Sequence, residues 1–158
     1  MKSLKSLKTA IALAAFAAAF GAHAATDTAQ LEIRGSVATN CTIAVTPTAK
    51  ATTLDILGGE SDTLVGVVTE NCNNGNGYTV SLTSNNAGQL LSKATGAKPY
   101  SYAARYDDGV GDIAKQIVAG RDKAFFGRSG NLSVSFSGDK QAIAGVYSDI
   151  INLVIAGK

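Results

Sequence analysis

The chain of 158 residues has one histidine, no tryptophan, two cysteines and two prolines. The histidine, His23, lies in a segment that we interpret below as a removable leader. The rest of the chain therefore lacks the imidazole that most general acid–base sites, Ser–His or Cys–His triads and transition-metal sites use. The sequence predicts a protein that is not an enzyme, with no metal and no cofactor.

An acidic loop offers three carboxylates that a calcium ion could use. Asp107, Asp108 and Asp112 stand close together around two glycines. Their spacing does not match the ligand positions of an EF-hand loop, in which carboxylates recur at fixed alternate positions. A solvated turn is therefore the favoured interpretation, and a calcium site is the alternative.

The first 24 residues have the pattern of a secretory signal peptide. Three lysines come first, at positions 2, 5 and 8, and an apolar run over residues 10–22 follows. The run ends at Ala22-His23-Ala24, and a basic start, a short apolar run and a small-x-small end are typical of such signals. The run is too short to span a bilayer as a helix, so we predict export without membrane insertion.

Loss of residues 1–24 would change the balance of charge. The chain has 14 Lys+Arg and 12 Asp+Glu, and the three lysines of the leader would leave with it, which gives 11 against 12 and a net charge of −1. A protein that follows a phosphate backbone needs clustered basic residues. We therefore do not expect nucleic acid as a partner.

Both cysteines, Cys41 and Cys72, follow the leader. An exported chain matures in an oxidising space, where an even number of cysteines favours a disulfide. The alternatives are two separate buried thiols, or a metal site that two sulfurs alone would not complete. We predict a Cys41–Cys72 bond between the first strand of the domain and a strand or loop one hairpin later.

The sequence after the leader is a series of short strands and turns. Apolar and polar residues alternate, with the period of a strand, over residues 29–37, 78–83, 100–105 and 132–137. Turn signals such as residues 73–77 separate them, and no long stretch has a helical period. This pattern predicts an all-β sandwich, with a short strand over residues 54–56 and a last strand over residues 147–156.

An amphipathic strand comes almost directly after the predicted cleavage site. Its small and apolar positions are Ala29, Leu31, Ile33, Gly35 and Val37, and polar residues separate them. Such a strand either completes its own domain or serves a partner chain, and the residues alone leave both interpretations open.

Both ends of the mature chain resemble pilus subunits of the chaperone–usher pathway. Residues 30–41 are similar to the segment that joins the donor strand to the first cysteine in type 1 rod subunits. Gly145-Val146-Tyr147-Ser148-Asp149 resembles the closing motif of the spore-coat-U-like subunits of the archaic branch. Gly157 is the penultimate residue, where type 1 rod subunits usually have tyrosine, so the resemblance leaves the branch open.

The resemblance implies an incomplete immunoglobulin-like sandwich that is completed by donor-strand exchange. Residues 25–37 would be the donor extension and residues 38–158 the pilin domain. In the donor strand, Ala29, Leu31, Ile33 and Val37 would enter pockets of the next subunit, and Gly35 would lie where the groove is shallow. The acceptor groove and the chaperone contact would include Tyr147, Ile151, Leu153 and Ile155.

The function implied is that of a structural subunit of a bacterial surface pilus or fimbria, which polymerises head to tail and supports adhesion or biofilm formation. Its expected partners are identical or related subunits, a periplasmic chaperone and an outer-membrane usher. Its expected location is the cell surface, after passage through the periplasm. The alternatives are a secreted, self-complemented sandwich with a matrix or carbohydrate-binding role, and a small secreted hydrolase, which the missing histidine disfavours.

Overall fold

A computed structural model describes residues 27–158, so the predicted signal peptide lies outside the described residues. The chain divides into two units, one up to Gly35 and one from Ser36 to Lys158. In the first unit, residues 27–35 have no regular secondary structure and their side chains are exposed. The strand predicted over residues 29–37 is therefore not formed within the chain itself.

The second unit is built almost wholly from strands, with a single short 3-10 helix among its elements. In chain order these are β1 (Cys41–Pro47), η1 (Ala49–Thr52), β2 (Gly59–Cys72), β3 (Tyr78–Ser84), β4 (Gln89–Leu90), β5 (Tyr100–Ser101), β6 (Ala103–Tyr106), β7 (Val110–Asp112), β8 (Gln116–Arg121), β9 (Phe125–Ser137) and β10 (Ile151–Gly157). Within residues 27–158, no helix is long and apolar enough to cross a membrane.

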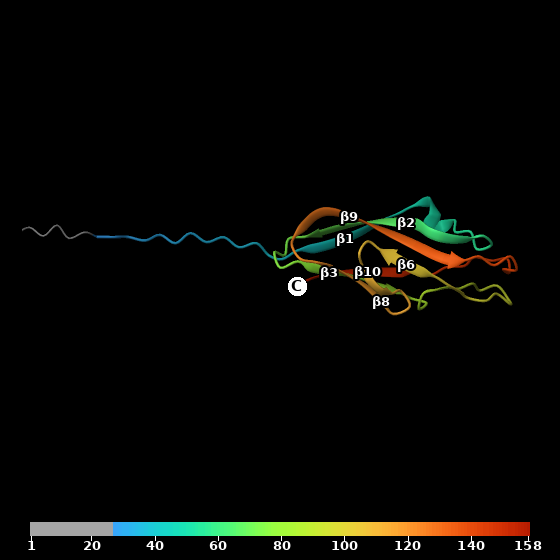
Figure 1. Cartoon of the computed structure of the whole chain (residues 1–158). Helices are drawn as coiled ribbons and strands as arrows, with labels where there is room; N and C mark the ends of the chain where they lie inside the picture. The colour runs from blue at the N-terminus through green and yellow to red at the C-terminus, as the bar shows by residue number, and fades with distance from the viewer. Residues whose placement is uncertain (1–26) are drawn as a thin grey trace, which may run out of the picture. The chain divides into compact units, whose positions relative to one another are not determined.

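Two four-stranded antiparallel sheets form the body of this unit (Figure 1). The strand order is β1-β2-β9-β6 in one sheet and β10-β3-β8-β7 in the other, while β4 and β5 form a small separate ladder. The predicted class, an all-β immunoglobulin-like sandwich, is confirmed. Its completion by a donor strand stays a prediction.

The alternation in sequence places the core between the two sheets. Successive side chains of a strand point to opposite faces, so Tyr78, Val80 and Leu82 of β3 all point inward and are fully buried. Ile117 of β8 and Val68 of β2 are buried in the same way from their own strands. The centre of each sheet therefore has a closed, well-packed inner face.

Two predicted strand boundaries are wrong. The last strand begins at Ile151, because Ser148 instead exchanges two backbone hydrogen bonds with Leu91, of 2.9 and 3.0 Å. Residues 54–56 do not form a strand, because the Asp55 carboxylate accepts hydrogen bonds from the amides of Leu57 and Gly58 and closes a turn. In both places, backbone groups that a strand would use for its ladder are hydrogen-bonded instead to a side chain or to a distant segment.

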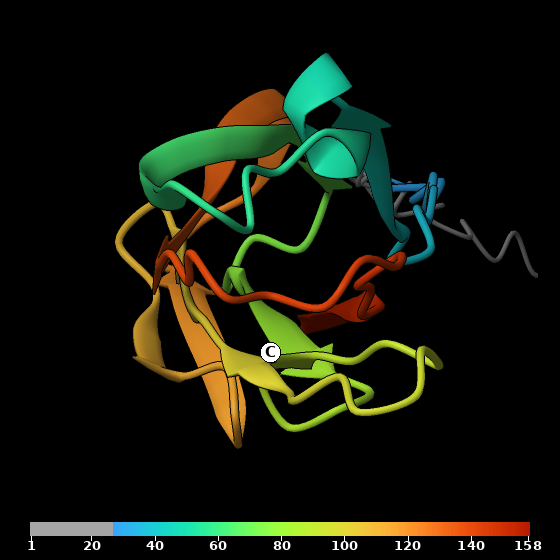
Figure 2. The ribbon, with the colours of Figure 1, turned by 90° about the vertical axis from the view of Figure 1, so that its right-hand side faces the viewer.

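The two ends of the sandwich differ, and we name them by what lies there. At the cysteine end, Cys41 and Cys72 face each other across β1 and β2 and form the disulfide predicted from the sequence. The turn over residues 73–77 and the C-terminal Lys158 lie at the same end. At the opposite end, the crossover end, residues 138–150 pass from β9 to β10 across the opening between the sheets (Figure 2).

A buried charge cluster ties the two sheets together near the cysteine end. Glu70 of β2 is fully buried and accepts hydrogen bonds from both tyrosines that face it, Tyr78 of β3 and Tyr106 of β6. Its carboxylate also pairs with Arg121 of β8 at 3.0 Å and with Arg128 of β9 at 3.2 Å. Because β3 and β8 belong to one sheet and β2, β6 and β9 to the other, one carboxylate links both layers.

Two carboxylates of the acidic loop complete this cluster. Asp108 pairs with Arg121 at 2.8 Å, and Asp107 pairs with Arg128. Within residues 27–158, no group of three or more His, Cys, Asp or Glu side chains is arranged to hold a metal ion. Asp107 and Asp108 therefore balance the two arginines, while Asp112 accepts a hydrogen bond from the amide of Ala114.

We predict that Glu70→Gln lowers the free energy of unfolding by about 3 kcal/mol at neutral pH, because it leaves the buried Arg121 without its main counter-charge. Burial raises the pKa of Glu70, but hydrogen bonds from Arg121, Tyr106 and Tyr78 outweigh it and hold the pKa below the ordinary 4.5. This contribution is therefore present above that pH and is lost as the pH falls through the folded-state pKa. Urea titrations at neutral and acidic pH should show a smaller difference between the two proteins in acid.

The control is Asp122→Asn, which removes a carboxylate beside Arg121 that is exposed and has no ion pair among the described residues. It should change the free energy of unfolding by less than about 0.5 kcal/mol. Equal effects of the two substitutions would contradict a special role of Glu70.

Candidate functional site

The sandwich has an open seam, which we define as the boundary between β1 and β10. β1 is an edge of one sheet and pairs only with β2, while β10 is an edge of the other and pairs only with β3. Within the described residues no ladder joins β1 to β10. Each strand therefore presents a row of unpaired backbone groups, which is a template for another strand.

The apolar side chains along the seam lack full cover. Ile151, Leu153 and Ile155 of β10 point inward but are only half-buried, whereas Leu82 on the neighbouring β3 is fully buried. On the other side of the seam, Val45 of β1 remains 43% exposed. Full burial of such a side chain contributes about 1.5–3 kcal/mol, so the seam leaves stabilisation unrealised that a further strand would supply.

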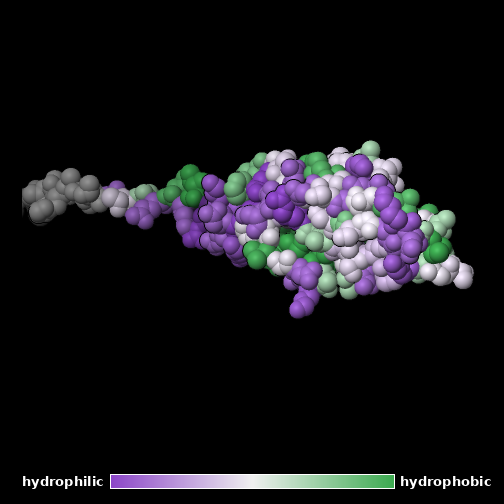
Figure 3. Space-filling model, turned by 45° about the vertical axis from the view of Figure 1, so that its right-hand side comes forward, coloured by the Kyte–Doolittle hydropathy of each residue, from purple (hydrophilic) through white to green (hydrophobic). Residues whose placement is uncertain are grey.

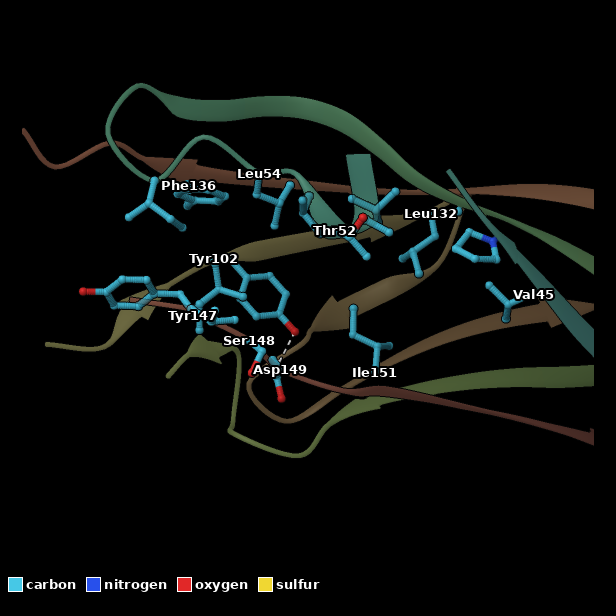
Figure 4. Close-up of a pocket in the computed structure, with 18 of the residues that line it drawn as sticks. Val45, Thr52, Leu54, Tyr102, Leu132, Phe136, Tyr147, Ser148, Asp149 and Ile151 are labelled. Carbon is cyan, nitrogen blue, oxygen red and sulfur yellow. Dashed lines mark hydrogen bonds between the residues drawn. The ribbon is translucent and has the colours of Figure 1, made fainter. Parts of the chain in front are cut away.

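A cavity of about 540 Å³ opens along this seam between the sheets (Figure 4). Its apolar lining comes from both sheets and from the crossover segment, with Val45, Leu54, Leu132, Phe136, Tyr147 and Ile151 as its main side chains. The volume lies in the range, roughly 300–1,000 Å³, of pockets that take up a ligand. Its lining suits aliphatic or aromatic groups.

The seam is not equally open along its length. The cavity is lined by Pro47 at the end of β1 and Ile151 at the start of β10, both at the crossover end. At the cysteine end the strands are in contact: a Cβ on Gly157 would lie 3.5 Å from the Thr39 side chain and 3.6 Å from the sulfur of Cys41. The groove is therefore wide at the crossover end and narrow at the cysteine end.

One half-buried carboxylate, that of Asp149, fixes the inner wall of the cavity. Asp149 accepts hydrogen bonds from the hydroxyls of Tyr102 at 2.7 Å and Ser84 at 2.5 Å, and from the amides of Asn86 and Ile150. Burial raises the pKa of Tyr102, and its hydrogen bond to Asp149 raises it further, so the phenol stays protonated as the donor. Both carboxylate oxygens are engaged, so Asp149 anchors the crossover segment.

The structure brings together part of the predicted acceptor groove. Tyr147 and Ile151 line the cavity, although Tyr147 does so from the crossover segment and not from the last strand as predicted. Leu153 and Ile155 follow on the same inner face of β10, toward the narrow end, and do not line it.

The predicted donor residues are free of contacts that would bury them. In the first unit, Leu31 is 85% and Ile33 87% exposed, and Ala29 is also exposed. Gly35 has open space around its α-carbon, and Val37, at the start of the second unit, is exposed. Their role as a donor strand stays a prediction.

Sequence reasoning missed the polar residues that organise the site. Glu70 stands on the inward face of β2, in phase with Val68 and Cys72, and that phase is visible in the sequence. A carboxylate at an inward position signals a buried partner, because an unpaired buried charge is too costly. Asp149 and Tyr102 gave no such signal, because their contact joins segments 47 residues apart.

No family model matches the sequence, and a search of curated proteins found no match. Among solved structures, the chain is similar to the E. coli Hda pilus minor tip subunit, HdaB. The two share 11% sequence identity with a TM-score of 0.39, over 72% of this chain and 79% of that chain. This likeness concerns the β fold alone.

We predict that Leu153→Asp prevents stable accumulation of the mature protein, because it places a carboxylate on the inner face of β10 at a cost of several kcal/mol. The yield of soluble protein and its thermal midpoint are the measurements. The control is Val154→Asp, since Val154 points outward on the same strand and is 59% exposed. Comparable yields and midpoints for the two variants would show that this face of β10 is not part of an apolar groove.

Proposed function

We propose that the protein is a structural subunit of a bacterial surface pilus, and that its copies polymerise by donor-strand exchange. The observation that carries this proposal is the open seam, with its two unpaired strand edges and its rows of half-buried aliphatic side chains. Residues 26–37 of one copy would fill the seam of the next. An added strand gains main-chain hydrogen bonds for affinity and side-chain pockets for specificity.

The chemistry of the extension fits the seam. A strand between β1 and β10 would lie about 4.8 Å from each neighbour and would turn every second side chain inward. Leu31 and Ile33 belong to the inward set, while Glu32 and Arg34 form an ion pair on the other side of the strand. Apolar side chains would thus meet an apolar cavity, and the charges would stay in water.

The shape of the seam favours exchange between copies over self-completion. β1 and β10 run in opposite directions, so a strand between them is antiparallel to one and parallel to the other in either orientation. A copy's own Val37 stays next to Ala38, which is held at the cysteine end, where the groove is narrow. Its own extension would therefore have to enter at the narrow end, whereas the extension of another copy would enter at the wide crossover end, antiparallel to β10.

Exchange of this kind produces an open polymer. Each copy gives one strand and receives one through different surfaces, so the contact is heterologous and does not close. Before assembly, the exposed seam is an aggregation hazard that a partner must cover. The pilus resemblance suggests that a periplasmic chaperone and an outer-membrane usher provide that cover, and that the polymer supports adhesion or biofilm formation at the cell surface.

We predict that Ile33→Asp abolishes polymers of the mature chain, because it would drive an unpaired charge into an apolar pocket at a cost of several kcal/mol. The control, Arg34→Ala, changes the polar side of the same strand and should polymerise normally. Electron microscopy and heat-resistant ladders on gels report the outcome; Ile33→Asp polymers as abundant as the unmodified ones would rule out this segment as the donor.

A second test separates exchange from self-completion. A mature chain without residues 26–34 should form no polymer, and a synthetic peptide of residues 26–37 should raise its thermal midpoint. The same peptide with Asp at position 33 is the matched control and should have no effect. The contrary result is a shortened chain that has the thermal midpoint of the intact one, with no change when the peptide is added. The seam would then need no strand from another copy, and a secreted matrix or carbohydrate-binding sandwich would be the better interpretation.

A further inference from the structure

At the cysteine end, hydrogen bonds hold the residues just before β1 against the turn that follows β2. The side chain of Asn73 donates a hydrogen bond to the carbonyl of Ala38 at 2.9 Å and accepts one from the amide of Asn40 at 2.7 Å. The backbone amide of Asn73 also donates to the carbonyl of Asn40 at 3.2 Å. Residues 38–40 are therefore clamped to the turn after β2 and do not act as a free linker.

Because of these hydrogen bonds, which we call the clamp, no flexible linker residue remains between the domain and its proposed donor strand. Val37 is the last residue of the donor strand that we propose, and Ala38 is the first clamped residue. Consecutive α-carbons are only about 3.8 Å apart. When Val37 of one copy lies in the seam of another, the cysteine end of the first copy must lie directly against the second.

The direction of the donor strand determines which end of the receiving copy lies against the cysteine end of the donating copy. A donor antiparallel to β10 ends where β10 begins, at Ile151, which is the crossover end. The cysteine end of each donating copy would therefore face the crossover end of the receiving copy.

Both ends carry exposed apolar side chains outside the groove. Phe126, near the start of β9 at the cysteine end, is 75% exposed, and this irregular part of the strand is held by a hydrogen bond from the amide of Gly127 to the side-chain oxygen of Asn71. At the crossover end, Leu57 is 51% and Ile143 45% exposed, and neither lines the cavity. Figure 3 shows apolar side chains at the crossover end of the domain.

We infer that successive copies of this chain share a second interface besides the donor strand, in which the cysteine end of one copy packs on the crossover end of the next. Phe126 and Ile143 are its apolar contacts, and Asn73 is a positioning residue that fixes the angle between copies. The inference rests on the proposed donor-strand exchange. Its occupant is a second copy of this chain, because the clamp brings that copy and no other molecule to this surface.

The first experiment measures the stiffness of the joint. Asn73→Ala should leave the amount of polymer unchanged but shorten its persistence length in electron micrographs. Hydrogen exchange at the Asn40 amide should become about tenfold faster, as expected for the loss of one hydrogen bond. Asn76→Ala is the control, since its exposed side chain lies in the same turn and makes no hydrogen bond among the described residues. Unchanged persistence length in Asn73→Ala would overturn the positioning role.

The second experiment separates the interface from the groove. Phe126→Ser and Ile143→Glu are made in the full mature chain, and each is studied as polymer and as monomer capped with the peptide of residues 26–37. The capped monomers should melt like the unmodified one, because the peptide has no attached domain. The polymers should dissociate about tenfold faster, the usual effect of losing an interface anchor. Val154→Asp, on the outer sheet face, should dissociate at the normal rate.

The outcomes distinguish a failure of the proposed function from a failure of the second interface. Unmodified chain that takes up the peptide but never polymerises would refute the proposed function. Polymers whose dissociation is unaffected by both substitutions would refute the second interface alone. Capped monomers that are weakened as much as the polymers would also refute it, because the residues would then act through the fold or the groove.

Discussion

The missing pairing between β1 and β10 is the constraint on which the rest of the structure depends. Two four-stranded sheets bury a continuous core at their centres, yet both end in an open edge on the same side. Backbone groups along that side have no ladder partner within the described residues, and the aliphatic side chains there are only partly covered. A strand is the one element that satisfies both at once, because it supplies hydrogen bonds to two edges and side chains to the cavity.

A sandwich with an open side needs its sheets held together elsewhere. The Glu70 cluster does this near the cysteine end, where Tyr78 and Arg121 reach Glu70 from the opposite sheet. The disulfide lies at the same end and joins β1 to β2 within one sheet. A disulfide of this loop length stabilises by about 3–4 kcal/mol in the chain-entropy model. The crossover end has Asp149 as its anchor. The cysteine end is the one from which the proposed donor extension leaves the domain, and the crossover end is the one that would receive a strand.

The sequence predicted those parts of the structure that depend on local periodicity. Alternation along β3 and β9, the glycine–asparagine turn and the cysteine pair led to the sandwich class and to the disulfide. The start of β10 could not be predicted, because Ser148 pairs with Leu91 through contacts between distant segments. The cavity depends on which strands become sheet edges, and strand order is not encoded in the period of any one strand. The same holds for the Asn73 clamp, which appears in the sequence only as a turn residue.

Register is the remaining physical requirement on a donor strand. Main-chain hydrogen bonds along β1 and β10 would form equally well if the strand slipped by one residue, but a slip turns every side chain to the other face. In the slipped register Glu32 and Arg34 would point into the apolar cavity while Leu31 and Ile33 would face water, so each charge would have to be desolvated. A slip by two residues keeps the faces but moves Leu31 and Ile33 along the seam, toward or away from the wide crossover end. The alternation therefore disfavours odd slips, and under the proposed exchange even slips differ in how well the apolar side chains fill a groove that is wide at one end and narrow at the other.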